Sequence, residues 1–454
     1  MSDYKHRYLP VTEEDRKEML ETIGVQSVDE LFDDIPASVR DSVKEAFKQL
    51  PEALTESELK KHAVEIAAKN VNADDYAYFL GAGVYDHFIP AVVSSITQRQ
   101  EFLTAYTPYQ PEASQGELQA LFEYQTMLAE LTGMYVTNDS TYDGFVSLGE
   151  ACNLATKQSK RNKVLLSMGV HPQGREVLHT YGYGMDYEVE DIPLKGDVTD
   201  FDKLKEAFSA DEVGAIVVQY PNFLGSIEDL KAIKDLMEGS KALLIVSANP
   251  LALGVLESPG ALGADIVVGD TQPFGIPMSF GGPHAGYIAT TKKYMRKLPS
   301  RIIGQTVDAN GQRGYAMTMQ TREQHIRREK ATSNMSSNQG LMALTSAVFM
   351  SAVGKEGIIE MAKRNINKAH YLAKALKEKG FDVLNESAFF NEFIVDLKQP
   401  VAEVNKALLD KGFVGGYDVS DVYGQDNTVL LCATEKRTKE EIDAFVEALV
   451  EVTK

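Results

Sequence analysis

Short runs of strand-forming residues, separated by amphipathic stretches, recur through the middle of the chain. The runs predicted as strands are Val164–Met168, Glu176–Tyr181, Ala215–Gln219, Ala242–Val246, Ile266–Gly269 and Tyr287–Thr290. Patterns with helical spacing lie between several of them, including Asp202–Phe208 and Ile227–Met237. This alternation predicts an α/β fold with a mainly parallel sheet and helices on both faces.

The first 75 residues are predicted to be helical. Residues 12–70 show amphipathic patterns with short breaks, and Thr12 followed by Asp15 matches a helix start. This segment offers few groups for chemistry. We expect a helical N-terminal arm over residues 1–75, of the kind that packs on a neighbouring subunit or caps the main domain.

A proline-stiffened loop that carries Tyr106 and Tyr109 precedes a long predicted helix. Ser114 with Glu117 is typical of a capping box, and Gly133 is typical of the end of that helix. The two tyrosines fit either a buried core or a ligand lid or subunit contact. The sequence alone leaves both interpretations open.

The last part of the chain predicts a linking helix and a small α/β domain. A helical stretch runs from Asn338 to Gly380, and short strand and helix patterns alternate after it. We therefore expect a large α/β domain over residues 76–337. The linking helix and the small C-terminal domain are expected over residues 338–454.

The composition of the 454-residue chain is that of an ordinary soluble protein, with 44% hydrophobic and 25% charged residues. No apolar run approaches the ~18–20 residues of a membrane span, and the polar N-terminus shows no signal-peptide core. Cys152 and Cys432 lie far apart, which suits a reducing compartment without a disulfide framework. We expect a cytoplasmic protein that does not enter a membrane.

The formal net charge of −20 argues against a general nucleic-acid-binding protein. The charge is uneven, because the segment Lys292–Lys330 carries ten Lys and Arg against three acids, a local +7. A solvated surface and a site for an anion, such as a phosphate, a carboxylate or an acidic partner, both fit this segment. No metal site is predicted.

The stretch Gly263–Gly286 (GADIVVGDTQPFGIPMSFGGPHAG) predicts a buried strand, a loop rich in glycine and proline, and a second strand. In pyridoxal-phosphate enzymes of the aspartate-aminotransferase fold, one strand ends in an aspartate that pairs with the pyridine nitrogen. The next strand ends in the lysine that forms the Schiff base. Aligned with that pattern, Val246 replaces the aspartate and Pro273 replaces the lysine. No lysine occurs between Lys241 and Lys292.

The expected phosphate-binding helix start is also altered. Small residues in that loop let backbone N–H groups approach the phosphate oxygens. Phe145 and Val146 occupy the loop instead, and Ser147 alone offers a hydroxyl. His171 follows the first predicted strand, at a position where a residue of this fold often stacks on the cofactor ring. The pocket thus keeps the expected layout but lacks the groups that hold the cofactor.

Three long segments, TPYQPEASQG, GADIVVGDTQPFGIPMSFGGPHAG and QTREQHIRREKATSN, resemble the P-protein of the glycine cleavage system, glycine decarboxylase. The start, YLPVTEEDRKEML with GVQSVDELFDDIP, is similar too, so the resemblance covers about residues 4–340. In that family some members are one long chain and others are split into two subunits. The pocket without a lysine resembles that of subunit 1, the N-terminal type. One departure is GFVSLGEA, where the family usually shows a smaller, more glycine-rich run.

The resemblance implies a fold type I chain that works with a partner in glycine catabolism. Glycine dehydrogenase (aminomethyl-transferring, decarboxylating) removes the carboxylate of glycine as CO2 on pyridoxal phosphate. It then passes the aminomethyl group to the lipoyl arm of the H-protein. Subunit 2 would hold the cofactor covalently, this chain would be inactive alone, and the assembly would be an α2β2 heterotetramer.

The resemblance also implies residues that act across the interface. The segment Glu329–Asn334 (EKATSN) matches the E-x-G-T-x-N loop of related enzymes, with Ala331 in place of glycine. That loop reaches the phosphate of the partner's cofactor. We expect four residues to contact this phosphate: Thr332, Ser333, Asn334 and Arg328. As an alternative, Thr332 caps the following helix.

Tyr106 and Tyr109 are the predicted contacts to glycine or to the lipoyl arm in the shared cleft. Two other interpretations of the chain stay open. One is a non-catalytic scaffold or regulatory subunit that gives no residue to its partner's site. The other is an independent enzyme whose pyridoxal-phosphate fold was recruited to other chemistry, for example a small-molecule sensor that uses the altered pocket.

Overall fold

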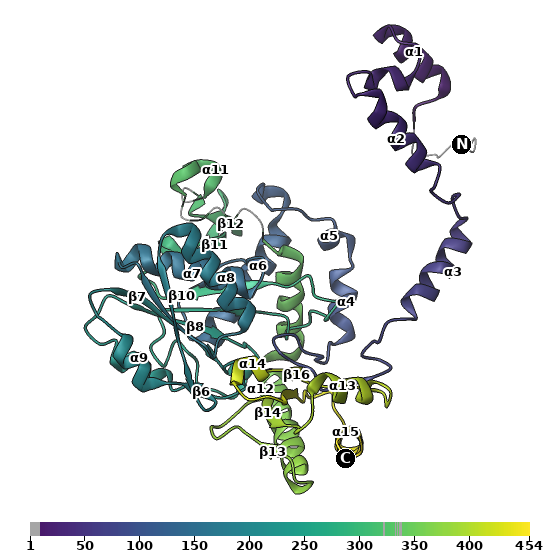
Figure 1. Cartoon of the computed structure of the whole chain (residues 1–454). Helices are drawn as coiled ribbons and strands as arrows, with labels where there is room; N and C mark the ends of the chain where they lie inside the picture. Colours follow the sequence, from purple (N-terminus) through teal and green to yellow (C-terminus); the bar gives the residue numbers. More distant parts are fainter. Residues whose placement is uncertain (1–9, 321–322, 332, 334, 336–337) are drawn as a thin grey trace. The chain divides into compact units, whose positions relative to one another are not determined.

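The computed structural model describes residues 10–320, 323–331, 333, 335 and 338–454. The chain divides into two units, Met1–Val71 and Asn72–Lys454. The second unit contains the sheets that position the candidate site (Figure 1). The three-domain division expected from the sequence stays a prediction.

The first unit is helical. Its elements are α1 (Glu13–Ile23), the 3-10 helix η1 (Val28–Phe32), α2 (Ala37–Phe47) and α3 (Glu56–Ala67). Thr12 and Asp15 form the predicted capping box at the start of α1. The three α-helices bury no residue, so their apolar side chains form no core among the described residues of this unit. Amphipathic helices of this kind are stabilised mainly by packing on another surface.

A seven-stranded sheet forms the centre of the second unit (Figure 1). In spatial order its strands are β2 (Val136–Thr137), β10 (Gly286–Thr290), β9 (Ile266–Asp270), β8 (Leu243–Ala248), β7 (Val213–Tyr220), β3 (Lys163–Ser167) and β4 (Glu188–Ile192). The last five are parallel, and β10 is antiparallel to both of its neighbours. The carboxyl ends of the parallel strands therefore lie at one edge, where sheets of this kind bind ligands.

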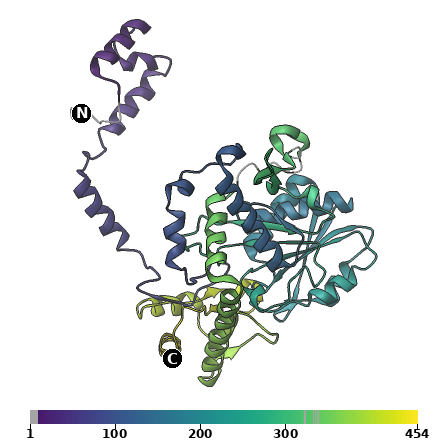
Figure 2. The ribbon, with the colours of Figure 1, turned by 180° about the vertical axis from the view of Figure 1, so that it is seen from behind.

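Side chains alternate along the central strands between two cores. In β7, Ala215 and Val217 belong to one core, and Ile216 and Val218 belong to the other. Two helices cover the first core: α7 (Gly144–Ser159) and α8 (Pro172–Met185). Five α-helices contribute described residues to the second: α4 (Ala91–Thr97), α6 (Gln115–Thr132), α9 (Phe201–Ala207), α10 (Leu230–Leu236) and α12 (Gly340–Glu378). The predicted α/β architecture with helices on both faces is confirmed, and Figure 2 shows α12 beside α6 from behind.

Helix α12 links the large sheet to the C-terminal part of the chain. It has 39 residues and a kink at Gly354, where φ is +63°. Among the described residues it is the one helix long and apolar enough to cross a membrane, judged by length and composition only. Phe349 packs in the core of the large sheet and Leu372 in the C-terminal core, so apolar side chains along α12 are used in protein packing.

The C-terminal part contains a four-stranded sheet with helices packed against it. Its strands are β13 (Asp382–Val383), β14 (Glu392–Asp396), β17 (Thr428–Cys432) and β16 (Tyr417–Asp418), and the main helices are α13 (Val401–Leu409) and α15 (Lys439–Val452). The smaller elements of the second unit include β1 (Ala77–Tyr78), α4 (Ala91–Thr97), α5 (Gln100–Leu103), β11 (Ile302–Val307), β12 (Arg313–Thr318), α11 (Gln324–Arg327) and β15 (Phe413–Val414).

One predicted strand is wrong. The stretch Glu176–Tyr181 lies inside α8, and the strand of this region is β4, further along the chain. Pro172 occupies the first turn of α8, a favoured position for proline. The buried residues Gly174, Leu178 and Gly182 recur every four positions, which is the spacing of one helix face.

The predicted capping box at the start of α6 is also wrong in its detail. Ser114 is the N-cap residue, but its side chain makes no capping hydrogen bond. The Gln115 side chain instead holds this end of the helix, because it bonds the Pro111 carbonyl and both backbone groups of Tyr315 at 2.8 Å. The helix start is thus fixed by β12.

Glu392 at the start of β14 is a buried carboxyl that joins the C-terminal sheet to the segment before α4. Its oxygens accept hydrogen bonds from the Ala82 N–H at 2.6 Å and the Tyr85 hydroxyl at 2.8 Å. Burial raises the pKa of Glu392 to about 7 in spite of these bonds. Since the folded pKa lies above the ordinary value of 4.5, the stability contributed by this group is complete below that value and is lost as pH rises through about 7.

The variant Glu392→Gln keeps the size of the side chain and removes its titration. Between about pH 5 and about pH 8, we expect the wild type to lose about 3 kcal/mol of unfolding free energy relative to the variant. Denaturant unfolding of both proteins across this range measures the difference. A stability difference that does not change with pH would contradict the assignment.

Candidate functional site

The candidate cofactor pocket lies where β8 and β9 end and α7 begins. The start of α7 is in close contact with β9, since a Cβ atom added to Gly144 would lie 3.1 Å from the carbonyl carbon of Gly269. Three polar side chains gather beside this contact: Asp143, Asp270 and His284. Among the described residues, no group of three or more His, Cys, Asp and Glu side chains is arranged to hold a metal ion.

Two carboxylates bind the N–H groups at the start of α7. Asp143 is the N-cap, and its Oδ1 accepts a hydrogen bond from the Val146 N–H at 2.7 Å. Asp270 Oδ2 accepts one from the Gly144 N–H at 3.2 Å. The N–H groups of a helix start are natural donors to a phosphate. In this chain the carboxylates of Asp143 and Asp270 accept these hydrogen bonds in place of a phosphate.

The charges at this helix start also oppose an anion. Burial is the main cause that raises the pKa of Asp143, and the charge of Asp270 adds to it. His284 Nδ1 lies 3.4 Å from Asp270 Oδ1, and this hydrogen bond raises the pKa of the histidine. Among the described residues, Asp143 and Asp270 have only His284 between them as a nearby positive partner. A phosphate at the start of α7 would therefore be repelled by carboxylates at the position where it needs hydrogen-bond donors.

Aromatic side chains fill the space in front of the helix start. The ring of His171 lies 4.8 Å from that of Phe145 and 4.7 Å from that of Phe223, measured between centroids. Its Nε2 lies 3.0 Å from the Ala82 carbonyl oxygen, and burial lowers its pKa. His171 is therefore packed between side chains of its own chain rather than facing an open cofactor site.

The two positions that should hold the cofactor ring are apolar and enclosed. Val246 is fully buried in the core of the sheet, and Pro273 is also buried. Next to it, the Gln272 side chain bonds both backbone groups of Tyr85, at 3.0 and 2.9 Å. On the other side, Phe274 stacks on a phenylalanine of α12. The residues present do not fit pyridoxal phosphate.

Neither predicted tyrosine contact is a core residue. Tyr106 is 89% exposed and Tyr109 is 50% exposed. The Tyr109 hydroxyl accepts a hydrogen bond from Arg301 Nη2 at 3.1 Å, and its ring meets that of His325 edge-on at 6.2 Å. The interpretation of this loop as buried core is thus wrong, and the two tyrosines face the surface of this chain.

The predicted phosphate-binding segment is partly described. Arg328 is exposed and follows α11 directly. Ser333 Oγ accepts a hydrogen bond from the Met335 N–H at 3.0 Å. Burial raises the pKa of Glu150 on α7, and the Ser333 hydroxyl opposes this rise. Two further predicted residues, Thr332 and Asn334, lie outside the described residues. The described contacts tie Ser333 to α7 and Tyr109 to Arg301.

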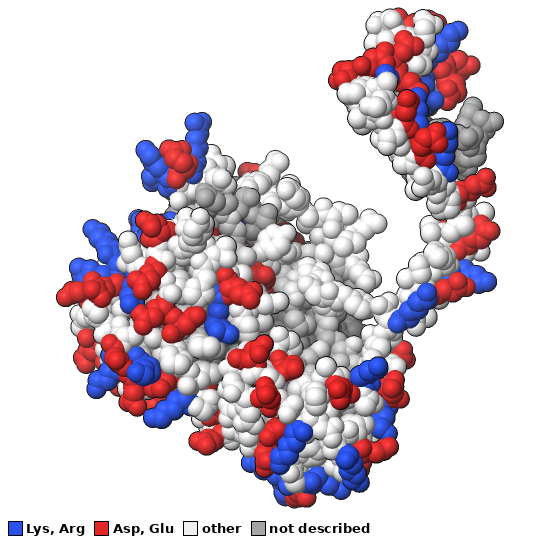
Figure 3. Space-filling view, viewed as in Figure 1, with Lys and Arg blue, Asp and Glu red and all other residues white. Residues whose placement is uncertain are grey.

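Two segments beside these residues carry almost no charge. Arg99 and Glu101 are the only charged residues from 88 to 111, and residues 271–291 contain no Lys, Arg, Asp or Glu. Several aromatic side chains in or near these segments are half exposed or more: Phe88, Tyr106, Tyr109, Tyr142 and Phe280. Figure 3 shows few charged side chains over α4 and α5 and many over α9. Exposed aromatic rings on a charge-poor surface are typical of a protein interface.

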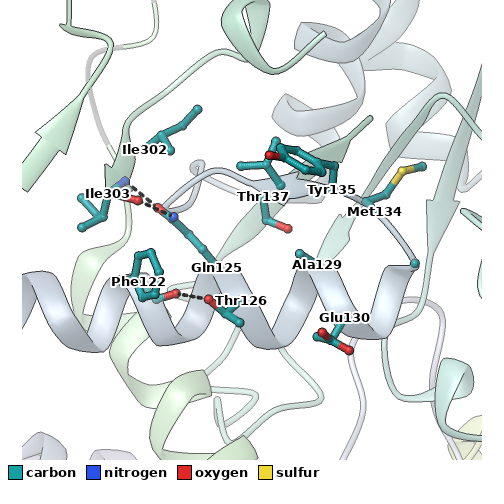
Figure 4. Close-up of a pocket in the computed structure, with 12 residues that line it drawn as sticks. Phe122, Gln125, Thr126, Ala129, Glu130, Met134, Tyr135, Thr137, Ile302 and Ile303 are labelled. Carbon is teal, nitrogen blue, oxygen red and sulfur yellow. Dashed lines mark hydrogen bonds between the residues drawn. The ribbon is translucent and has the colours of Figure 1, made fainter. Parts of the chain in front are cut away.

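A surface pocket of about 400 Å³ lies between α6, β2 and β11 (Figure 4). Gln125 crosses beside it from α6 and bonds both backbone groups of Ile303. Its apolar lining includes Phe122, Met134 and Ile302. None of the predicted site residues that the structure describes lines this pocket.

Sequence reasoning missed the two carboxylates that close the helix start. Asp143 had a usable signal, because an aspartate directly before a helical pattern is a common N-cap. Asp270 had none, since its contact with Gly144 joins residues 126 positions apart. The buried Asp139 beside Arg301 was also missed, for the same reason.

Comparison with known proteins agrees with this architecture. A family model described as "Glycine cleavage system P-protein" matches residues 6–449. Proteins from Bacillus cereus (strain ATCC 10987 / NRS 248) and Bacillus thuringiensis subsp. konkukian (strain 97-27) are each 56% identical over 445 residues. Each alignment covers 97% of this chain and 98% of the relative, and both relatives are named "Probable glycine dehydrogenase (decarboxylating) subunit 1".

Solved structures show the same fold. A crystal structure of glycine decarboxylase (P-protein) of the glycine cleavage system, in inhibitor-bound form, is 43% identical with a TM-score of 0.88, covering 98% of this chain and 100% of that one. An aspartate aminotransferase from Thermus thermophilus, 13% identical with a TM-score of 0.58, covers 83% of this chain and 98% of that one and shares the fold. The expected aspartate-aminotransferase-like fold is confirmed, and the chain belongs to the P-protein family of the glycine cleavage system.

Proposed function

We propose that this chain is subunit 1 of a two-subunit glycine decarboxylase and that its partner, subunit 2, holds pyridoxal phosphate covalently. The complex removes the carboxylate of glycine and transfers the aminomethyl group to the lipoyl arm of the H-protein. Relatives named subunit 1 align with nearly the whole chain, which supports the assignment. A cytoplasmic location and an α2β2 assembly complete the proposal.

The observation that carries the proposal is the closed pocket at the start of α7. Asp143 and Asp270 hold the N–H donors, and Pro273 stands where the amine is needed. A chain of this family without its own cofactor site contributes to the reaction only beside a partner that has one. The chemistry is therefore assigned to the contact between the two subunits.

The bound cofactor supplies an electron sink for loss of the glycine carboxylate. The residues of this chain then have three tasks: to orient the substrate, to add donors to the phosphate and to exclude water. Tyr106 and Tyr109 are the residues proposed for the first task. Those proposed for the second are Arg328, Thr332, Ser333 and Asn334.

The charge-poor segments at residues 88–111 and 271–291 are the proposed contact with subunit 2. Their exposed rings would be buried there, and each fully buried aromatic side chain of this size contributes about 1.5–3 kcal/mol. Burial of these two segments would also exclude water from the shared cleft. This placement puts the loop that carries Tyr106 and Tyr109 at the interface between the two subunits.

Mixing the purified chain with subunit 2 tests the proposal. We expect glycine-dependent CO2 exchange from the mixture and none from this chain alone. In the mixture, Tyr109→Phe should lower kcat/KM for glycine about tenfold, the effect of one lost hydrogen bond to a charged group. Tyr106→Phe tests the second ring in the same way.

Tyr183→Phe is the matched control, because Tyr183 lies on α8 and is 94% exposed. It should leave turnover unchanged. If Tyr106→Phe, Tyr109→Phe and Thr332→Ala all leave turnover and cofactor affinity at wild-type values, the chain is a scaffold and the shared site is refuted.

The closed pocket is tested with the isolated chain. We expect no visible absorbance band of a protein-bound Schiff base after addition of pyridoxal phosphate. The variant Pro273→Lys should also show no band that survives dialysis, because Asp143 and Asp270 still hold the α7 donors. A stable band in this variant would show that the lysine alone was missing and that the helix start is open.

A further inference from the structure

The turn that follows β10 carries four cations that none of the roles above uses. All four side chains are exposed, and we call them the basic turn: Lys292, Lys293, Arg296 and Lys297. The last two belong to the 3-10 helix η4 (Met295–Lys297). Tyr294 and Leu298 of the same turn are buried in the core that α7 and α8 cover. These two apolar side chains fix the turn on the sheet, and the four cations remain on the surface.

The basic turn lacks the carboxylates that accompany many other cations of this chain. The sequence contains no Asp or Glu from residue 271 to residue 307. Among the described residues, no side chain of the basic turn makes an ion pair. Asp265, whose charge acts on Lys293, is already paired with Lys234 at 2.7 Å. A solvated surface usually mixes both signs of charge, and the basic turn does not.

Aromatic rings lie under two of these cations. Lys292 Nζ is 5.6 Å from the centroid of the Tyr135 ring, and Lys293 Nζ is 4.8 Å from that of Tyr294. A ring face attracts a cation but does not neutralise its charge. The four positive charges within six residues therefore repel one another. An acidic partner would relieve this repulsion.

The basic turn fits an extended acidic surface better than a single small anion. A phosphate or a carboxylate is best held by converging donors, commonly those of a bidentate arginine. The basic turn instead has three lysines and one arginine, all exposed. Such charges attract a partner that carries several acids of its own. The net charge of −20 argues against a nucleic acid as that partner.

Charged and aromatic surfaces suit partners of different lifetimes. Permanent interfaces are rich in buried apolar side chains, and the charge-poor segments at residues 88–111 and 271–291 are proposed above for the contact with subunit 2. Exposed charges mainly accelerate association, and salt weakens their effect. A protein that carries the lipoyl arm must bind and leave in every turnover, so fast association benefits it most. The basic turn has the chemistry suited to this transient partner.

The basic turn lies near the residues proposed to contact the substrate. Lys297 and Arg301 are four positions apart, which limits the distance between their Cα atoms to about 14 Å. Arg301 Nη2 donates a hydrogen bond to the Tyr109 hydroxyl at 3.1 Å. A protein docked at the basic turn would therefore be close to the loop that carries Tyr106 and Tyr109.

We propose that the basic turn is the docking surface for the lipoyl-carrying H-protein, which meets it with an acidic surface. This inference rests on the proposed function. It goes beyond it by assigning the carrier to four residues of this chain outside the segments proposed to contact subunit 2.

The test neutralises the basic turn in the complex with subunit 2. The fourfold variant Lys292→Gln, Lys293→Gln, Arg296→Gln, Lys297→Gln should raise the KM for H-protein about tenfold at low ionic strength. Its kcat and its KM for glycine should stay at wild-type values. Added salt should raise the wild-type KM for H-protein more than that of the variant, because salt screens exposed charges.

A second fourfold variant is the matched control: Lys203→Gln, Lys205→Gln, Lys231→Gln, Lys241→Gln. It changes the net charge by the same amount at exposed lysines on and near α9 and α10. It should leave the KM for H-protein unchanged, and equal rises in both variants would overturn the inference. If the first variant does not fold, Arg296→Gln with Lys297→Gln decides. This pair keeps the two cations that lie over rings and should give a smaller rise in the same KM.

Three other results overturn the inference. An unchanged KM for H-protein would identify the basic turn as an ordinary solvated surface. Loss of association with subunit 2 in analytical ultracentrifugation would place the basic turn in the permanent interface. Binding of inorganic phosphate to the wild type but not to the variant, measured by calorimetry, would identify a site for a small anion.

The docking surface and the proposed function fail differently. If the wild-type mixture shows glycine-dependent CO2 exchange and the variant keeps the wild-type KM for H-protein, the docking surface is wrong and the proposed function stands. If the wild-type mixture with H-protein shows no such exchange, the proposed function itself is wrong.

Discussion

The hydrogen-bond donors at the start of α7 are the constraint on which this structure depends. A helix start presents N–H groups that have no partner within the helix, and they must bind a side chain, water or a ligand. In this chain Asp143 and Asp270 bind them. A phosphate would have to displace carboxylates that belong to the same chain and repel it. In this fold the carboxyl edge of the sheet usually binds a cofactor. In this chain the helix start at that edge is satisfied by side chains of the chain itself.

Under the proposed function, a closed pocket in an intact fold places the chemistry at a surface shared with the partner subunit. The sheet, its covering helices and the loops at its carboxyl edge remain, and they present exposed aromatic rings on segments with almost no charge. The helical N-terminal unit buries none of the residues of its three α-helices. Both features are typical of a chain that completes its packing in an assembly.

The sequence predicts the parts of this account that depend on residue identity and local pattern. The strands β8 and β9 follow from short apolar runs, and the missing lysine at Pro273 follows from the absence of any lysine between Lys241 and Lys292. Glu176–Tyr181 lies inside α8 although its pattern predicts a strand, because six residues with a mixed pattern do not separate a strand from one helix face. Longer context around Pro172 would have favoured the helix.

The contacts that close the pocket and support the surface depend on the fold itself. Asp270 meets Gly144 across 126 positions, and Asp139 meets Asn338 across 199. No local pattern marks such pairs, because their partners become neighbours only when the sheet has formed. The exposure of Tyr109 does not follow from local pattern for the same reason. Thr332 and Asn334 lie outside the described residues, so their role stays a prediction.

The location of the covalently held cofactor tests the central claim most directly. The complex of this chain with subunit 2 can be reduced with borohydride, which fixes a Schiff base permanently, and the peptides of both chains can then be analysed by mass spectrometry. The account predicts a pyridoxyl group on one lysine of subunit 2 and none on this chain. A pyridoxyl group on any lysine of this chain would contradict it.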